Sequence, residues 1–179
     1  MIHLLFVHLP IGLLVTYSLF EIIRFKKVNQ LPYWFYVKAV LSIFGVMAAY
    51  IALATGEGAE HLIEKTGTDF QKSIVETHAG FATATTIIFS IIAFSYLVEW
   101  LRRTEKINEI LNRRFKKVFL FLIKLSNFIR KPILLISLAV LGTLLLIVTG
   151  GLGAAMVYGQ DVDPIVSFIY SLVSPFLEN

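Results

Sequence analysis

The sequence contains no cysteine, and this absence excludes several classes of site at once. Disulfide bonds, thiolate metal sites and haem attached covalently through a C-x-x-C-H motif all need cysteine thiols. The chain also lacks an H-E-x-x-H spacing, a P-loop, a dinucleotide fingerprint and a serine–histidine–acid order. A hydrolase function therefore has little support, and whether the chain is an enzyme stays open.

Long apolar runs are what the sequence has in excess, since 57% of its residues are hydrophobic. A helix needs about 20 apolar residues to cross the hydrocarbon core of a bilayer. Four runs qualify, at about 2–23, 34–54, 79–101 and 132–158. A fifth apolar piece, 165–177, is too short to span and is interpreted as a surface helix or a partner contact. We therefore expect a single all-α domain over 1–179, an integral membrane four-helix bundle.

Basic residues are scarce on one side of the predicted membrane. Of the 16 lysines and arginines, all but Lys65 and Lys72 lie in one of two segments, 24–38, which reaches into the start of the second span, and 102–131, between the last two spans. The positive-inside rule places both segments in the cytoplasm and both chain termini outside. The net charge of +4 is thus a topology signal, and it does not indicate a nucleic-acid partner.

The first apolar run is preceded by no basic residue, and its basic flank follows it. A cleavable signal peptide has the opposite arrangement. We expect a retained helix with its N-terminus outside.

Between the third and fourth spans, about 105–125, apolar residues recur at helical spacing with arginine and lysine between them. This pattern predicts a cytoplasmic amphipathic helix. It would lie on an anionic leaflet or serve as a docking site for a cytoplasmic partner.

Small residues line parts of the second and fourth spans. Gly45, Ala49, Ala52 and Gly56 share one face of the second, and the fourth ends TGGLGAAMVYG. Such faces allow another helix to approach closely. A flat cofactor lying against them is the alternative.

The four histidines, His3, His8, His61 and His78, all fall on the predicted outer side. His8 and His78 belong to different spans at comparable depth, which is what bis-histidine ligation of haem b requires. We therefore predict His8 and His78 as the metal ligands, with His3 or His61 as substitutes or supporting partners. The slot would be walled by Gly45, Ala49, Ala52, Gly80, Ala82, Ala84 and Gly150.

An external metal site is a second possibility. It would combine three or four of these histidines with the nearby acids Glu57, Glu60, Glu64 and Glu76.

The segments HLLFVHLPIGLL, TGEGAEHLIEK, IVETHAGFA and TGGLGAAMVYG together resemble a bacterial family of small four-helix membrane proteins, domain of unknown function 2231. The resemblance covers about 2–159. The matching positions are His3, His8, Pro10, Thr55, Gly56, Glu57, His78, Gly150, Gly153 and Tyr158. It implies a multi-pass protein of the bacterial inner membrane, similar to haem-binding b-type cytochromes or accessory subunits of respiratory chains.

Three functions remain open from the sequence. The first is electron transfer through an outer b-type haem, with a quinol or other membrane or extracytoplasmic redox subunits as partners. The second is a non-redox assembly subunit of a larger membrane complex. The third is a metal-binding protein of the external face.

Overall fold

The computed structural model describes the backbone of residues 2–24, 26–66 and 69–176. Side chains are described over the same ranges except at 2–5, 26, 59–60, 62–64, 66, 69–71 and 176. In this part of the chain every regular element is a helix, which confirms the predicted all-α class. The helices are α1 (Ile2–Ile23), α2 (Lys26–Asn29), α3 (Trp34–Thr66), α4 (Asp69–Arg103), α5 (Glu105–Ile129), α6 (Pro132–Tyr158), α7 (Pro164–Val173) and the short 3-10 helix η1 (Ser174–Phe176).

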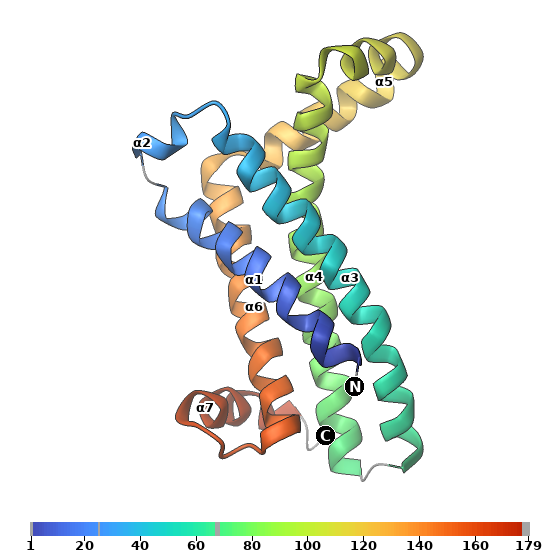
Figure 1. Ribbon diagram of the computed structural model, residues 1–179, viewed down its shortest axis with the longest axis vertical. Helices are drawn as coiled ribbons and strands as arrows, with labels where there is room; N and C mark the ends of the chain where they lie inside the picture. Colours follow the sequence, from blue (N-terminus) through green and yellow to red (C-terminus); the bar gives the residue numbers. More distant parts are fainter. Residues whose placement is uncertain (1, 25, 67–68, 177–179) are drawn as a thin grey trace.

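Four of these helices, α1, α3, α4 and α6, are long and apolar enough to cross a membrane. They form the bundle in Figure 1, in which α1 packs on α3 and α6, and α4 packs on α3 and α6. The core between them is built from apolar and aromatic side chains, including Leu14, Tyr17, Phe89 and Ile92, each with no exposed surface. The four predicted spans are therefore confirmed as the four long helices.

Helices α3 and α4 continue well beyond the predicted spans. They contain 33 and 35 residues, so each is about 50 Å long, against a hydrocarbon thickness of about 30 Å. The second and third spans were predicted at 34–54 and 79–101, because the apolar runs stop at residue 54 and resume at residue 79. The added segments, 55–66 after the second span and 69–78 before the third, contain several good helix formers such as glutamate and lysine, so the helices extend. His78 consequently lies inside α4 and does not open it.

The bundle has two ends of different character. We call the basic end the one that carries Arg24, Lys38, Arg102, Arg103 and Arg130. We call the acidic end the opposite one, where α3 meets α4 and where α7 lies (Figure 1).

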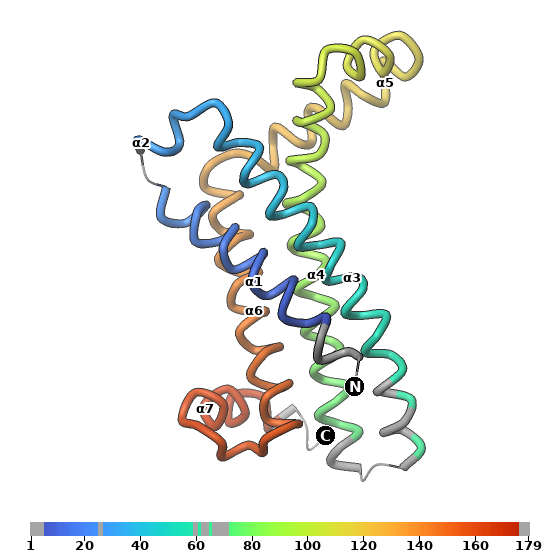
Figure 2. The backbone as a smooth tube through the Cα atoms, in the orientation of Figure 1, coloured from blue at the N-terminus to red at the C-terminus, as the bar shows by residue number. Residues whose placement is uncertain are grey.

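At the basic end α5 projects beyond the bundle, and its path bends back on itself (Figure 2). The bend lies at Phe115, whose φ of −133° and ψ of 33° depart from helical values. The second half of α5 returns to the bundle, where the Ser126 hydroxyl donates to the backbone oxygen of Ser95 at 2.8 Å. The predicted amphipathic connector at 105–125 is thus a bent helix anchored at its C-terminal end.

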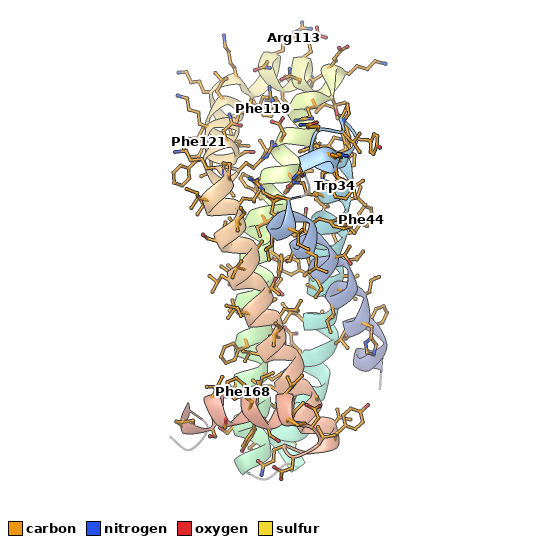
Figure 3. All side chains as sticks on the ribbon, turned by 90° about the vertical axis from the view of Figure 1, so that its left-hand side faces the viewer. Trp34, Phe44, Arg113, Phe119, Phe121 and Phe168 are labelled. Carbon is orange, nitrogen blue, oxygen red and sulfur yellow. The ribbon has the colours of Figure 1, made fainter. Side chains whose placement is uncertain are left out.

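At the acidic end α7 lies across the bundle (Figures 1 and 3). Its Asp163 N-cap accepts hydrogen bonds from the backbone N–H groups of Ile165 and Val166 at 2.8 and 2.9 Å. Val166 and Val173 pack with Leu152 of α6 and Ile74 of α4. The predicted surface helix at 165–177 is therefore a helix that packs on α6 and α4, as far as the described residues extend.

The side of the membrane on which each end lies stays a prediction, and the absence of cysteine makes it testable. Single cysteines replace two exposed residues, Arg113→Cys on α5 and Gln160→Cys after α6. We expect a membrane-impermeant maleimide to label Gln160→Cys in intact cells and Arg113→Cys only after permeabilisation, because the positive-inside rule places the basic end in the cytoplasm. The reverse pattern would invert the topology, and the cysteine-free parent chain supplies the unlabelled control.

Candidate functional site

His78 is the candidate ligand that the structure places between helices. It lies on α4, half-buried, and its Nδ1 is 3.0 Å from the backbone oxygen of Thr149 on α6. A carbonyl oxygen only accepts, so Nδ1 carries the proton in this contact. A Cβ built at Gly153 would lie 3.3 Å from the imidazole Cε1. The ring therefore rests on the part of α6 that lacks a side chain.

The other histidines are placed differently. The side chains of His8 on α1 and His61 on α3 are exposed, and that of His3 lies outside the described residues. The Tyr96 hydroxyl donates to Glu21 at 3.1 Å and so fixes the register of α1 against α4. His8 is 13 residues from Glu21 and His78 is 18 residues from Tyr96. Counted along the helices, His8 is about 7.5 Å closer to this contact. Within α1, His3 is the histidine at the matching distance along the chain, since it is 18 residues from Glu21.

Their assignment as ligands of one group stays a prediction. Among the described residues, no three histidine, aspartate or glutamate side chains come together as a possible metal site. Two of the acids proposed for the external site, Glu60 and Glu64, have side chains outside the described residues.

The small residues predicted to wall a haem slot fall into two groups. A Cβ at Gly45 would lie 2.5 Å from Leu14 of α1, and Ala49 is buried on the same helix. By contrast, Gly80 and Gly150 face open space, with no other atom within 4 Å of a built Cβ. Gly150 borders an open apolar groove between α6 and the start of α7.

At two further glycines of α6, as at Gly45, a side chain of a neighbouring helix fills the space where a Cβ would lie. A Cβ at Gly142 would lie 2.9 Å from the ring of Phe89, and one at Gly151 would lie 2.5 Å from Ile169 of α7. The glycines at these helix contacts admit a neighbouring side chain, which is the packing interpretation of the small-residue faces.

The densest polar cluster lies at the basic end and was not predicted as a site. The Glu21 side chain has no exposed surface, yet it contacts two cations, Arg24 Nη2 at 2.8 Å and Lys38 Nζ at 2.7 Å. The Tyr96 hydroxyl is its third partner. This cluster joins α1 to α3 and α4.

Glu99 forms a second cluster one step further along α4. Its side chain is 3% exposed and contacts Arg102 and Arg103 at 2.7 Å each, with Arg130 at 3.3 Å. The Arg103 and Arg130 guanidinium groups also lie over the ring of Phe35, 4.1 and 5.2 Å from its centroid. Cation–π contact of this kind stabilises arginine beside desolvated rings. The cluster ties the start of α6 and the end of α5 to α4 and α3.

A sequence signal for these clusters exists. Glu21 and Glu99 are acids inside apolar runs, and each has an arginine three residues later. Acids within spans face the bundle interior and pair. The partners on other helices, Lys38 and Arg130, depend on helix register, which spacing alone does not give.

Both tryptophans also lie at the basic end. Trp34 packs on Phe20 with ring centroids 4.7 Å apart, and Trp100 packs on Tyr36 at 5.5 Å. Aromatic residues of this type concentrate at membrane–water interfaces. We therefore expect the bundle to leave the hydrocarbon core near the level of Trp34 (Figure 3).

We predict a large loss of stability when the negative charge of Glu21 is removed. We expect Glu21→Gln to lower the free energy of unfolding by about 3 kcal/mol, because breaking a buried ion pair leaves its partner unpaired in a low-dielectric site. Unfolding in detergent micelles measures this effect. Glu109→Gln, at an exposed position of α5, is the control and should stay within about 0.5 kcal/mol. Equal stability of Glu21→Gln and the parent would contradict the stabilising role of the Glu21 cluster.

Comparison with known proteins supplies one family and no annotated relative. Neither the curated proteins nor the solved structures contain a match. The family described as "Predicted membrane protein (DUF2231)" matches residues 1–164, which include all four long helices. The chain therefore belongs to the DUF2231 family of membrane proteins, as its sequence motifs indicated.

Proposed function

We propose that this protein is a non-redox assembly subunit of a larger membrane complex. Its four-helix bundle is the membrane anchor, and α5 is the surface that it presents to its partners. The observation that supports this function is the occupation of the glycine faces. Leu14, Phe89 and Ile169 fill the positions opposite Gly45, Gly142 and Gly151, so these faces serve helix packing.

The anchor is rigid where α5 joins it. The return half of α5 is held by the Ser126–Ser95 hydrogen bond and by the Arg130–Glu99 ion pair. Beyond this root α5 exposes large apolar side chains, and Phe115 is 58% and Phe121 is 63% exposed. Phe121 is labelled in Figure 3. Basic residues flank them, namely Arg113, Arg114, Lys116, Lys117 and Lys124. An exposed surface that combines aromatic anchors with positive charge is suited to an acidic protein partner.

A test compares aromatic residues of equal exposure at two places. Phe115→Ala/Phe121→Ala on α5 removes the proposed docking residues, and Phe44→Ala on α3 removes a side chain that is 54% exposed in the middle of a span. In mild detergent extracts of native membranes, we expect the parent and Phe44→Ala to migrate on native gels with the same stoichiometric subunit. The α5 double variant should migrate without it, since hot-spot aromatics dominate interface energies.

Two results would contradict this proposal. One is a parent protein that runs alone after cross-linking in native membranes. The other is an α5 double variant that keeps its partner as well as Phe44→Ala does. Correct folding of each variant is checked by its melting temperature.

Haem binding is a second candidate function, favoured by one observation. The bond from His78 Nδ1 to the Thr149 carbonyl is the contact that metal-ligating histidines commonly make with their second nitrogen. His78 thus fits as an axial ligand. A core slot at Gly45 does not fit, because fully buried Leu14 occupies it. The haem would instead lie toward the open glycines, Gly80 and Gly150, and would accept and release single electrons for a quinol or an external redox subunit.

Absorption spectroscopy tests the second candidate directly. In that case the purified protein shows a b-type α band in the reduced-minus-oxidised spectrum. His78→Ala should abolish the band, and His8→Ala should abolish it as well when His8 is the second ligand. Glu109→Gln, at an exposed position of α5, is the control and should retain it. A colourless protein from haem-supplemented cells, or a full band in His78→Ala, would refute the assignment.

A further inference from the structure

Two hydroxyl groups inside the bundle have no described partner at hydrogen-bond distance, although the Tyr17 hydroxyl interacts with Tyr96 at longer range. They belong to Tyr17 and Ser18 of α1, whose side chains have 0% and 1% of their surface exposed. A buried hydroxyl without a partner costs free energy, and in a bilayer no lipid chain can supply one. These two groups therefore indicate a ligand that both donates and accepts hydrogen bonds.

The two hydroxyls are next to the Glu21 cluster. Tyr17 and Ser18 precede Glu21 by four and three residues, so all three share one face of α1. The ring of Tyr17 packs edge-on against Tyr96, 5.8 Å between centroids. The Tyr96 hydroxyl donates to the same Glu21 oxygen that Lys38 contacts. The unpartnered groups thus lie beside a continuous polar network.

This network leads toward solvent in one direction only. Side-chain exposure rises from none at Glu21 to 12% at Lys38 and 34% at Arg24, toward the basic end. In the opposite direction the fully buried side chains of Leu14, Phe89 and Ile92 close the bundle. The polar network therefore reaches the surface at the basic end, and we call this region, from Tyr17 to Arg24, the inlet.

We propose that this inlet is a water-binding site, in which water bridges the Tyr17 and Ser18 hydroxyls to the Glu21–Tyr96–Lys38 network. Water matches both hydroxyls, because each can donate one hydrogen bond and accept others. A metal cation is disfavoured by the adjacent Lys38 and Arg24, and an anion is disfavoured by Glu21. The bound water also lowers the desolvation penalty of the buried Glu21–Lys38 pair.

Radiolytic hydroxyl-radical footprinting of the full chain in lipid nanodiscs tests the site. Radicals form from water, so a buried side chain is oxidised only where water is bound beside it. We expect oxidation of Tyr17 despite its zero exposure. Phe89 is the internal control, because it is equally buried and its ring lies 6.4 Å from that of Tyr17 on the closed side. Ser18→Ala should reduce the oxidation of Tyr17 several-fold. Tyr17 as protected as Phe89 would overturn the proposal.

Melting temperatures give an independent test, because removing the Tyr17 hydroxyl should lower the melting temperature if water is bound there and should not lower it if the site is dry. Removing a hydroxyl that water satisfies loses hydrogen bonds, so Tyr17→Phe should lower the melting temperature by about 2–4 °C. Removing an unsatisfied hydroxyl would leave it unchanged or raise it. Tyr33→Phe, at a tyrosine that is 59% exposed, is the matched control and should not shift. An unchanged or raised value for Tyr17→Phe would overturn the proposal.

Discussion

Two carboxylates at the basic end, Glu21 and Glu99, hold the helices of this protein in register. Each is almost fully buried and each contacts cations from its own helix and from another. Burying a lone carboxylate in a membrane is prohibitive, so the cations are obligatory partners. Lys38 belongs to α3, and Arg130 follows α5 directly. The cost is therefore met only when α1, α3, α4 and the end of α5 adopt one mutual arrangement. The ionic contacts thereby select one packing of the bundle.

At the acidic end, the described contacts include close packing at glycine. Here α6 presents Gly151 to Ile169 of α7, and His78 of α4 rests beside Gly153. Lipid gives no hydrophobic driving force between helices, so close contact at glycine must supply the attraction. The two ends differ for this reason. Charged contacts fix the register at one end, and van der Waals packing fixes the distance between helices along the rest.

The fold was largely predictable from the sequence, whereas the site was not. Four apolar runs and the distribution of basic residues were enough for the number of helices, because both depend on composition over about 20 residues. The ends of α3 and α4 were not predictable from hydropathy, which measures affinity for lipid and not helix formation. The pairing of His8 with His78 needed the rotation of α1 and its register on α4. Both are set by the contact between Glu21 and Tyr96, which joins residues far apart in the sequence.

The charge balance of the two clusters connects folding with insertion. Five cations, Arg24, Lys38, Arg102, Arg103 and Arg130, surround two carboxylates, so three positive charges remain unneutralised at this level of the bundle. Neutral pairs alone would satisfy the buried acids. Under the predicted topology, the surplus would supply the positive charge that the positive-inside rule associates with the cytoplasmic boundary. The residues that we expect to orient the helices during insertion are therefore also the ones that hold them in register afterwards.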